Sequence, residues 1–389
     1  MLATSVAGID LDCCVYNASG PRTGSIDALQ KIGNSKSGAI LSKSATLVAQ
    51  DGNDMPRFIN KIDLGKSLCD GSVNSEGLPN YGIDYYISAE AVSSLTVFNK
   101  PYIVSLSGLS LKDNLEMLTR AYEVDGIAAI ELNLACPNIP GKPTIAYDFQ
   151  QMEDVLRQVT SHPSFGKKPL GVKLAPYFDF PYFEQATTII SKYAGIKYVV
   201  TTNTIGNSLF VDADHECEGF KAKGGYGGLG GGYVKQTALA NVRQLSLLFA
   251  QKGRSDIDIV GVGGVSSGRD AFELILCGAK AVQVGTCHWT EGSSCFKRIS
   301  SELADIMTQK GYKSIEEFRG KLKPYEKHTS TYGRKLSSGE SSNQTTTASH
   351  ASQSSSDMTM QLLAAVLAVV VAVLLADKFG VIGDVLKFP

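Results

Sequence analysis

Eight short apolar runs, separated by stretches long enough to hold a helix, constrain the fold of this 389-residue chain more than any other feature. Each run is rich in Val, Ile and Ala and is bounded by Gly, Pro or polar turns, which is typical of buried parallel strands. The runs cover residues 14–18, 38–43, 102–107, 127–133, 170–174, 198–203, 259–263 and 281–285, with helical patterns between them at 148–160, 182–193, 237–251 and 269–277. This alternation predicts an α/β fold, a (β/α)8 TIM barrel.

Two connections are too long for ordinary barrel loops. Residues 44–101 and the glycine-dense residues 206–233 each exceed the usual length. We expect both to form excursions over the face that carries the site.

Polar residues or glycine end six of the predicted strands, at Lys43, Asn133, Lys173, Asn203, Gly263 and Gly285. The carboxyl ends of the strands in a closed parallel barrel converge on one face, where active sites are built. These residues are therefore predicted to surround one cavity.

Glycine-rich loops follow the last two predicted strands: GVGGVSSG begins at Gly261, and Gly285 and Thr286 follow the eighth strand. Backbone N–H groups and a nearby helix dipole make these loops the recurrent phosphate site of such barrels. The run does not fit G-x-G-x-x-G, because Ser266 occupies the last glycine position, so a Rossmann site is rejected.

Cys136 lies in the loop after the fourth predicted strand, in the sequence NLACPN. A thiol that loses its proton readily can act as a general base. No His, Asp or Glu adjoins it, which favours proton abstraction over covalent catalysis. The alternative, that Cys136 is a packing residue, stays open on sequence alone.

Composition excludes several classes of protein. Lys and Arg total 37 against 38 Asp and Glu, so no net charge attracts nucleic acid, and a small-molecule partner is favoured. The eight cysteines include no C-x-x-C pair and no zinc-ligand spacing, which predicts reduced thiols and no metal site. The first 20 residues carry no secretory or mitochondrial signal.

The C-terminal part differs from the rest. A barrel domain over residues 1–327 is expected to be followed by a Ser/Thr-rich linker at 328–357, a hydrophobic helix at 358–376 and a short tail at 377–389. Residues 362–376 are uniformly apolar, which predicts a membrane-spanning helix rather than a buried or interfacial one. We expect the barrel in the cytosol, tail-anchored to the mitochondrial outer membrane or the endoplasmic reticulum.

Nine motifs in order give the chain a resemblance to a known family. They are NASG at Asn17, SKS at Ser42, NSEGLPN at Asn74, NLACPNIPGKP at Asn133, GVKLAPYFD at Gly171, TTNTIGN at Thr201, GGLGGGYVKQTALANVR at Gly227, GVGGVSSG at Gly261 and VQVGT at Val282. Over about residues 1–320 the sequence resembles the class 1A, fumarate-dependent dihydroorotate dehydrogenases. The resemblance implies an FMN-dependent homodimer that oxidises dihydroorotate to orotate in pyrimidine synthesis and is reoxidised in the same pocket by fumarate, giving succinate.

The resemblance also implies roles for individual residues. FMN is expected to contact Ala18, Ser19, Gly20, Lys43, Ser44, Asn133, Lys173, Gly231, Gly263, Gly264, Gly285 and Thr286. The substrate is expected to contact Lys43, Asn74, Gly77, Leu78, Asn133, Asn138, Asn203 and Thr204. Cys136 would remove the C5 proton while hydride passes from C6 to flavin N5. Lys43 would lie between flavin and substrate, and Lys173 would offset negative charge on the reduced ring.

One departure from the family pattern concerns the substrate. Glu76 stands where the family often has Met, and a carboxylate there would repel an anionic ligand unless it turns outward or meets a lysine.

Several alternatives stay open on sequence. A membrane-anchored relative could use quinone, or NAD through a partner subunit. A phosphate-binding isomerase or aldolase would explain the glycine loops but not the asparagines beside Cys136. A tethered scaffold with an inactive barrel would bind flavin without turnover.

Overall fold

The eight predicted barrel strands all form, and they make one parallel sheet. The computed structural model describes residues 1–62, 71–136 and 144–325, and contacts define one unit over Met1–Pro324. The strands are β3 (Val15–Asn17), β4 (Ile40–Leu41), β7 (Tyr102–Leu106), β8 (Ile127–Asn133), β9 (Leu170–Lys173), β10 (Ile196–Thr201), β15 (Asp258–Val262) and β16 (Ala281–Val284). They pair in the order β3-β16-β15-β10-β9-β8-β7-β4. The predicted barrel is confirmed.

The seam between β3 and β4 is closed without a regular ladder. The Asn17 side chain donates to the Leu41 carbonyl at 2.7 Å and accepts from the Leu41 N–H at 3.0 Å. The Gly38 N–H donates to the Val15 carbonyl at 2.8 Å. Asn17 thus replaces a pair of ladder bonds at the point where the barrel closes.

Gly38→Ala is expected to destabilise the barrel strongly. An alanine Cβ at this position would lie 1.7 Å from the Cys13 carbonyl oxygen, so backbone at the seam must move. We expect the free energy of unfolding to fall by about 4 kcal/mol or more in chemical denaturation. Gly24→Ala is the control, because its Cβ would meet nothing closer than 4.0 Å. If Gly38→Ala lowers the free energy of unfolding no more than Gly24→Ala does, close packing at the seam does not stabilise the barrel as described.

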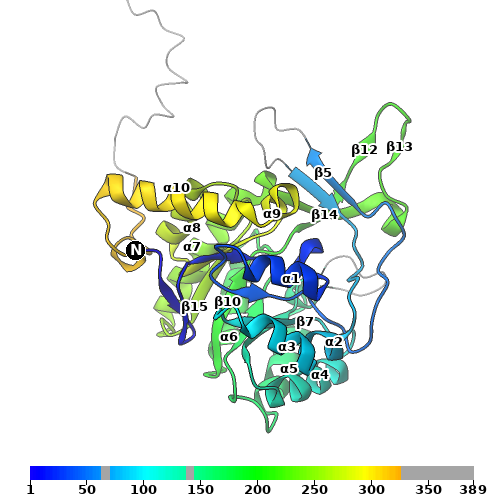
Figure 1. The fold of residues 1–389 in the computed structure, drawn as a ribbon, viewed down its shortest axis with the longest axis horizontal. Coiled ribbons are helices and arrows are strands. Elements are labelled where there is room, and N and C mark those ends of the chain that lie inside the picture. Colours follow the sequence, from blue (N-terminus) through cyan, green and yellow to red (C-terminus); the bar gives the residue numbers. More distant parts are fainter. Residues whose placement is uncertain (63–70, 137–143, 326–389) are drawn as a thin grey trace, which may run out of the picture. The chain divides into compact units, whose positions relative to one another are not determined.

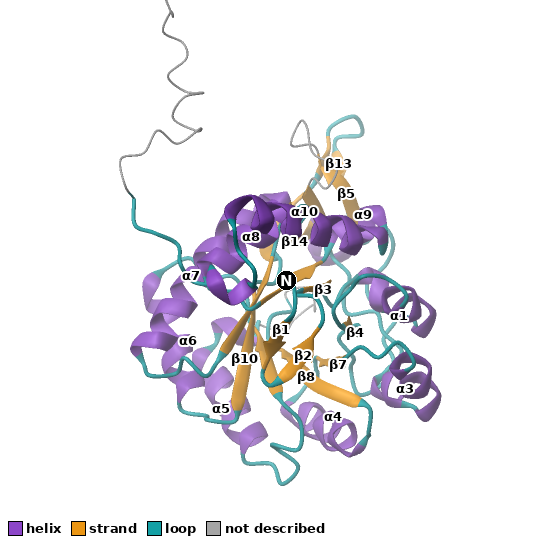
Figure 2. Ribbon diagram, turned by 60° about the vertical axis from the view of Figure 1, so that its left-hand side comes forward, coloured by secondary structure: helices purple, strands orange, loops and turns teal. Residues whose placement is uncertain are grey.

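Helices surround the strands (Figure 2). They are α1 (Ile26–Gly33), α3 (Ala89–Thr96), α4 (Leu111–Glu123), α5 (Phe149–Thr160), α6 (Phe180–Ser191), α7 (Lys235–Gln251), α8 (Gly268–Cys277) and α10 (Ser294–Lys310). The four predicted helices are confirmed, with ends shifted by at most two residues. Helix α5 shows why the hydrophobic pattern predicted these helices. Its buried stripe consists of Met152, Val155, Leu156 and Val159, at helical spacing, and the Asp148 side chain caps its first turn.

A hairpin at the N-terminus covers one end of the barrel. Strands β1 (Thr4–Val6) and β2 (Ile9–Leu11) pair antiparallel, and the Ala7 N–H donates to the Asp258 carboxylate at the start of β15, at 2.7 Å. In Figure 2 the N-terminus lies over the middle of the ring of helices. This hairpin was not predicted, and it leaves the opposite end, at the strand carboxyl termini, for the site.

The two long connections meet in a separate sheet, as Figure 1 shows for β5 and β14. Residues 44–101 supply β5 (Phe58–Ile62) and β6 (Gly71–Asn74), together with the short helix α2 (Ile83–Ile87), and residues 206–233 overlap β11 (Ile205–Leu209) and contain β14 (Tyr226–Gly231). The antiparallel order is β11-β14-β6-β5, with Asn74 opposite Gly228. A small hairpin, β12 (Val211–Asp212) with β13 (Cys217–Glu218), extends the second excursion.

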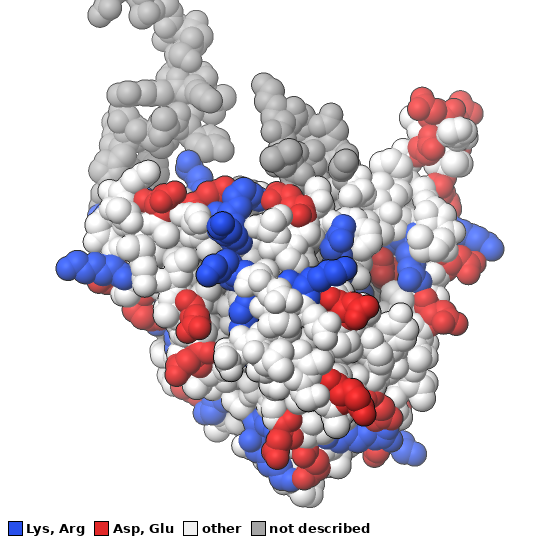
Figure 3. Space-filling model, viewed as in Figure 1, with Lys and Arg blue, Asp and Glu red and all other residues white. Residues whose placement is uncertain are grey.

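Charged side chains of both signs are interspersed on the face shown in Figure 3. No helix among the described residues is long and apolar enough to span a membrane. The linker and hydrophobic segment predicted at 328–357 and 358–376 lie outside the described residues.

Acid is expected to destabilise the barrel through His288, which lies in the short helix α9 (Thr286–Glu291). Burial, with a contribution from Arg22, lowers its pKa from 6.5 to about 4. The unfolded chain takes up this proton first as pH falls, so stability is lost between about pH 6.5 and 4, by up to about 3 kcal/mol. His288→Gln should remove this part of the pH dependence in chemical denaturation. An unchanged pH profile would contradict the assignment.

Candidate active site

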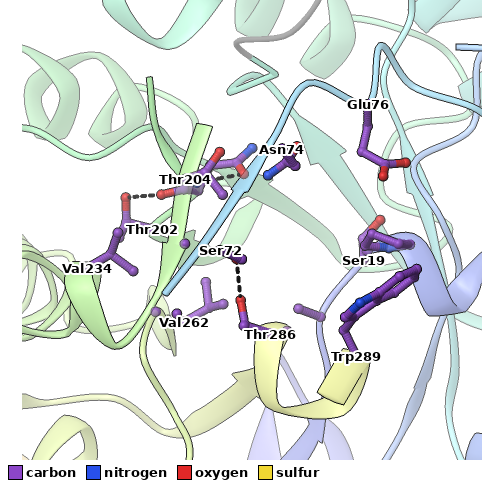
Figure 4. Close-up of a pocket in the computed structure, with 18 of the residues that line it drawn as sticks. Ser19, Ser72, Asn74, Glu76, Thr202, Thr204, Val234, Val262, Thr286 and Trp289 are labelled. Carbon is purple, nitrogen blue, oxygen red and sulfur yellow. Dashed lines mark hydrogen bonds between the residues drawn. The ribbon is translucent and has the colours of Figure 1, made fainter. Parts of the chain in front are cut away.

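The predicted site residues lie around one cavity at the carboxyl ends of the barrel strands, called the central cavity below (Figure 4). Its volume is about 1120 Å³, including the part open to solvent. It is lined by Ala18, Ser19, Gly20, Lys43, Ser44, Asn74, Gly77, Leu78, Asn133, Cys136, Lys173, Asn203, Thr204, Gly231, Gly263, Gly264, Gly285 and Thr286. Asn138 lies outside the described residues. Residues from both excursions and from seven strand ends thus meet here.

A chain of hydroxyl groups holds one wall of the cavity. The Ser44 hydroxyl lies 3.1 Å from that of Ser19 and 2.9 Å from that of Ser105. The Asn133 side-chain amide donates to Ser44 at 3.1 Å. Each of these side chains is therefore fixed by its neighbour before a ligand binds.

The asparagine amides are oriented by backbone groups. The Asn133 side-chain oxygen accepts from the Ala135 N–H at 3.0 Å, and the Asn203 amide donates to the Ala135 carbonyl at 2.7 Å. The Asn74 amide donates to the Gly228 carbonyl at 3.2 Å, across the antiparallel sheet. Preset amides can recognise a planar polar ring at little entropic cost.

Two lysines are buried in the cavity wall. Lys43 is 6% and Lys173 is 4% exposed, and burial lowers the pKa of both. Glu131 and Cys136 act in the opposite direction on Lys173. Among the described residues, the Lys173 ammonium group forms no hydrogen bond or salt bridge. A buried cation in this state favours an anionic or electron-rich ligand.

Cys136 lies where both lysines influence it. Its charge interaction raises the pKa of Lys43 and of Lys173, opposing burial in each case. The reciprocal effect of two nearby ammonium groups is to favour the thiolate, which is the basic form. The thiol is partly exposed to the cavity, so it can reach a ligand.

Glycine backbone forms the other end of the cavity. Gly231, Gly263 and Gly264 have φ angles of 74°, 133° and 70°, which other residues rarely adopt. A Cβ on Gly264 would lie 2.5 Å from the Lys235 Cβ. Ser72 and Thr286 close this end, with their hydroxyls 3.0 Å apart. Main chain without side chains therefore lines this end of the cavity, and a phosphate site requires accessible backbone N–H groups of this kind.

An aromatic pair that the sequence did not single out also lines the cavity. The Phe58 and Trp289 rings lie 4.5 Å apart, and the Arg22 guanidinium lies 5.1 Å from the Trp289 ring. Ser72, Val234 and Val262 are further lining residues that were missed. For these residues, one indication of a place in the site is present in the sequence: Trp289 follows shortly after the VQVGT motif. These residues give the cavity an apolar side.

The residues present fit a phosphorylated cofactor with an aromatic ring. The cavity combines an apolar side, a buried cation at Lys173 and a glycine-lined end, where positive φ angles at Gly263 and Gly264 disfavour side chains. Across residues 1–62, 71–136 and 144–325, no group of three or more His, Cys, Asp or Glu gathers to hold a metal ion.

Comparisons with known proteins agree with this geometry. Residues 1–307 match the protein family described as dihydroorotate dehydrogenase. The dihydroorotate dehydrogenase (fumarate) of Saccharomyces cerevisiae is 46% identical over 307 residues, covering 79% of this chain and 93% of the relative. Dihydroorotate dehydrogenase A (fumarate) of Lactococcus lactis subsp. cremoris is 43% identical over 324 residues, covering 83% and 99%. A crystal structure of DHODH from Eimeria tenella with ferulenol has a TM-score of 0.66 at 19% identity, covering 82% of this chain and 88% of that chain, and supports the fold alone.

Proposed function

The chain belongs to the dihydroorotate dehydrogenase family, and from this premise we propose that it oxidises (S)-dihydroorotate to orotate with fumarate as acceptor, in pyrimidine biosynthesis. The observation that carries the proposal is the meeting of Cys136, two buried lysines and three asparagines in one cavity. The names of both relatives specify fumarate.

The family implies a flavin, and we propose that it is FMN. Gly231, Gly263, Gly264, Gly285 and Thr286 would hold its phosphate. Ala18, Ser19, Gly20, Ser44 and Asn133 would contact the ring, with Lys43 and Lys173 beside it. A bound flavin supplies a two-electron acceptor for the hydride that leaves the substrate.

The substrate would be held by the preset amides. Asn74, Asn133 and Asn203 can pair with the ring amides and the carboxylate, because each presents both a donor and an acceptor. Gly77, Leu78, Thr204 and, by sequence, Asn138 would complete this set. Lys43 would face the substrate carboxylate with its ammonium group. Held in this way, dihydroorotate would place its C5 atom near Cys136.

Cys136 would move the proton. As a thiolate it takes the proton from C5 while hydride leaves C6, so the substrate loses two hydrogens in total. In the return half-reaction the thiol gives a proton to one fumarate carbon and the other carbon receives hydride, which yields succinate. The nearby lysines favour the thiolate, which is the form needed before the first step and regenerated by the second; between the two steps Cys136 carries the proton as a thiol.

Assembly and location are proposed from sequence. We expect a homodimer of the barrel domain, residues 1–327, followed by the linker 328–357, the hydrophobic helix 358–376 and the tail 377–389. The helix would anchor the cytosolic barrel to an intracellular membrane. A hydrophobic anchor supplies no acceptor site by itself, so fumarate is retained as the acceptor.

A panel of acceptors tests the assignment. The full-length protein, purified in detergent, is given dihydroorotate with fumarate, a short-chain quinone or NAD, and orotate formation is followed. Turnover with fumarate is expected. Turnover with quinone or NAD but not with fumarate would contradict the assignment of fumarate as the acceptor. A protein that binds flavin but forms no orotate with any acceptor would contradict the assignment of dihydroorotate as the substrate.

A further inference from the structure

Glu76 introduces a negative charge into a cavity whose proposed ligands are all anions. Its side chain lines the central cavity and is 11% exposed. Figure 4 shows its carboxylate pointing toward the part of the cavity in which Ser19 and Trp289 lie. Uncompensated, a carboxylate buried to this extent would be costly.

Two cations compensate this charge, each at the limit of ion-pair contact. The Glu76 carboxylate lies 4.0 Å from the Lys43 ammonium and 3.9 Å from the Arg57 guanidinium. Neither contact is a close hydrogen bond. Lys43 and Arg57 are therefore attracted by Glu76 but keep donors available for another anion.

The surrounding backbone fixes this cluster in place. The Arg57 guanidinium donates to the Asp51 carbonyl at 2.6 Å, and the Arg57 carbonyl accepts from the Ser75 N–H at 2.8 Å. The Glu76 carbonyl accepts from the Asn53 N–H at 2.9 Å. These bonds hold the main chain of Arg57 and Glu76 together, so the two residues stay beside each other in the cavity wall.

We infer that Glu76 is a charge-selecting residue, which weakens the binding of dianionic ligands in the central cavity more than that of monoanionic ligands. The inference rests on the proposed function, in which dihydroorotate and orotate carry one carboxylate and fumarate and succinate carry two. Coulomb energy is proportional to ligand charge, so repulsion from Glu76 acts up to twice as strongly on a dianion. An uncharged acceptor would not be affected.

Glu76→Gln tests this, because it removes the charge and keeps the shape. In the flavin-loaded full-length protein, orotate binding is measured from the flavin spectrum, and succinate binding from competition with orotate. We expect orotate to bind about tenfold more tightly at low salt, and succinate by a larger factor, up to its square, about a hundredfold. Added NaCl should reduce both gains.

Two further variants separate charge selection from a structural role. Asp54→Asn removes a negative charge from the same excursion, but its side chain is 73% exposed and pairs with Lys221, so neither ligand should respond. Arg57→Gln removes a compensating cation and should weaken succinate binding more than orotate binding. If Glu76→Gln fails to retain flavin, equal weakening of the two ligands by Arg57→Gln would show that charge in this cluster does not discriminate between them, and would overturn the inference.

The outcomes distinguish this inference from the proposed function. If Glu76→Gln changes the affinities for orotate and succinate by equal factors, or changes neither, the inference is overturned. The proposed function would still stand, because the unaltered protein would still turn over. Failure of the unaltered protein to bind orotate and to be reduced by dihydroorotate would overturn the proposed function and the inference together.

Discussion

Cys136→Ala is expected to slow the bleaching of bound flavin by dihydroorotate by about 10²–10⁴-fold, the usual contribution of a positioned general base. The thiol borders the cavity and interacts electrostatically with two buried lysines, Lys43 and Lys173. Anaerobic stopped-flow absorbance measures the rate of bleaching. Flavin content should stay near that of the unaltered protein, because the substitution removes no expected flavin contact.

An artificial electron acceptor provides the internal control for this variant. Reduced flavin in Cys136→Ala should be reoxidised by such a dye at the normal rate, since that step needs no proton from sulfur. Cys217→Ala is the matched control variant, because Cys217 is exposed and lies outside the cavity. Bleaching by Cys136→Ala within a factor of three of the unaltered rate would assign the proton transfer to another group.

Lys173→Met is expected to lower the midpoint potential of the bound flavin by about 60 mV or more. The reduced ring carries negative charge, and removing a buried cation beside it costs about 3 kcal/mol, which for a two-electron couple is about 60 mV. The variant should still fold, because burial raises the pKa of the neighbouring Glu131 and the loss of Lys173 would raise it further, keeping that carboxyl neutral. Potentiometric titration against a reference dye gives the potential.

Lys197→Met is the matched control for this change. Lys197 lies on β10, is 47% exposed and pairs with Asp256 at the surface, so its loss should leave the potential unchanged. Equal potentials in Lys173→Met and the unaltered protein would show that Lys173 does not face the flavin.

The barrel could be predicted because its signals are local. Each strand is a short apolar run, and a run such as 127–133 coincides with β8 because polar turns stand on both sides. Strand β4 is shorter than predicted, Ile40–Leu41 rather than 38–43, since side-chain bonds from Asn17 replace the ladder there. The predicted boundaries are least accurate where a side chain substitutes for backbone pairing.

The antiparallel sheet could not be predicted, because its pairing joins distant segments with weak local signals. Strand β14 reads YGGLGG, and glycine has low strand propensity, yet it pairs with β6 more than 150 residues earlier, as the hydrogen bond from Asn74 to Gly228 shows. Only the length of the two connections indicated an excursion.

Most of the site was predictable from where strands end, and the rest was not. Lys43, Asn133 and Lys173 were singled out because polar residues at strand carboxyl ends converge in a barrel. Phe58 reaches the cavity only through the unpredicted sheet, and the partners of Glu76 depend on the same sheet. Their roles are set by tertiary contacts that no periodicity reveals.

The central claim is that one cavity carries both half-reactions, and it is tested most directly by reducing and reoxidising the bound flavin in sequence. The full-length protein is mixed anaerobically with dihydroorotate, freed of excess substrate, and then mixed with fumarate while flavin absorbance is recorded. Bleaching by dihydroorotate and full recovery with fumarate, with orotate and succinate each inhibiting the other half-reaction competitively, are the predicted results. Recovery only with quinone, or no bleaching by dihydroorotate, would contradict the account.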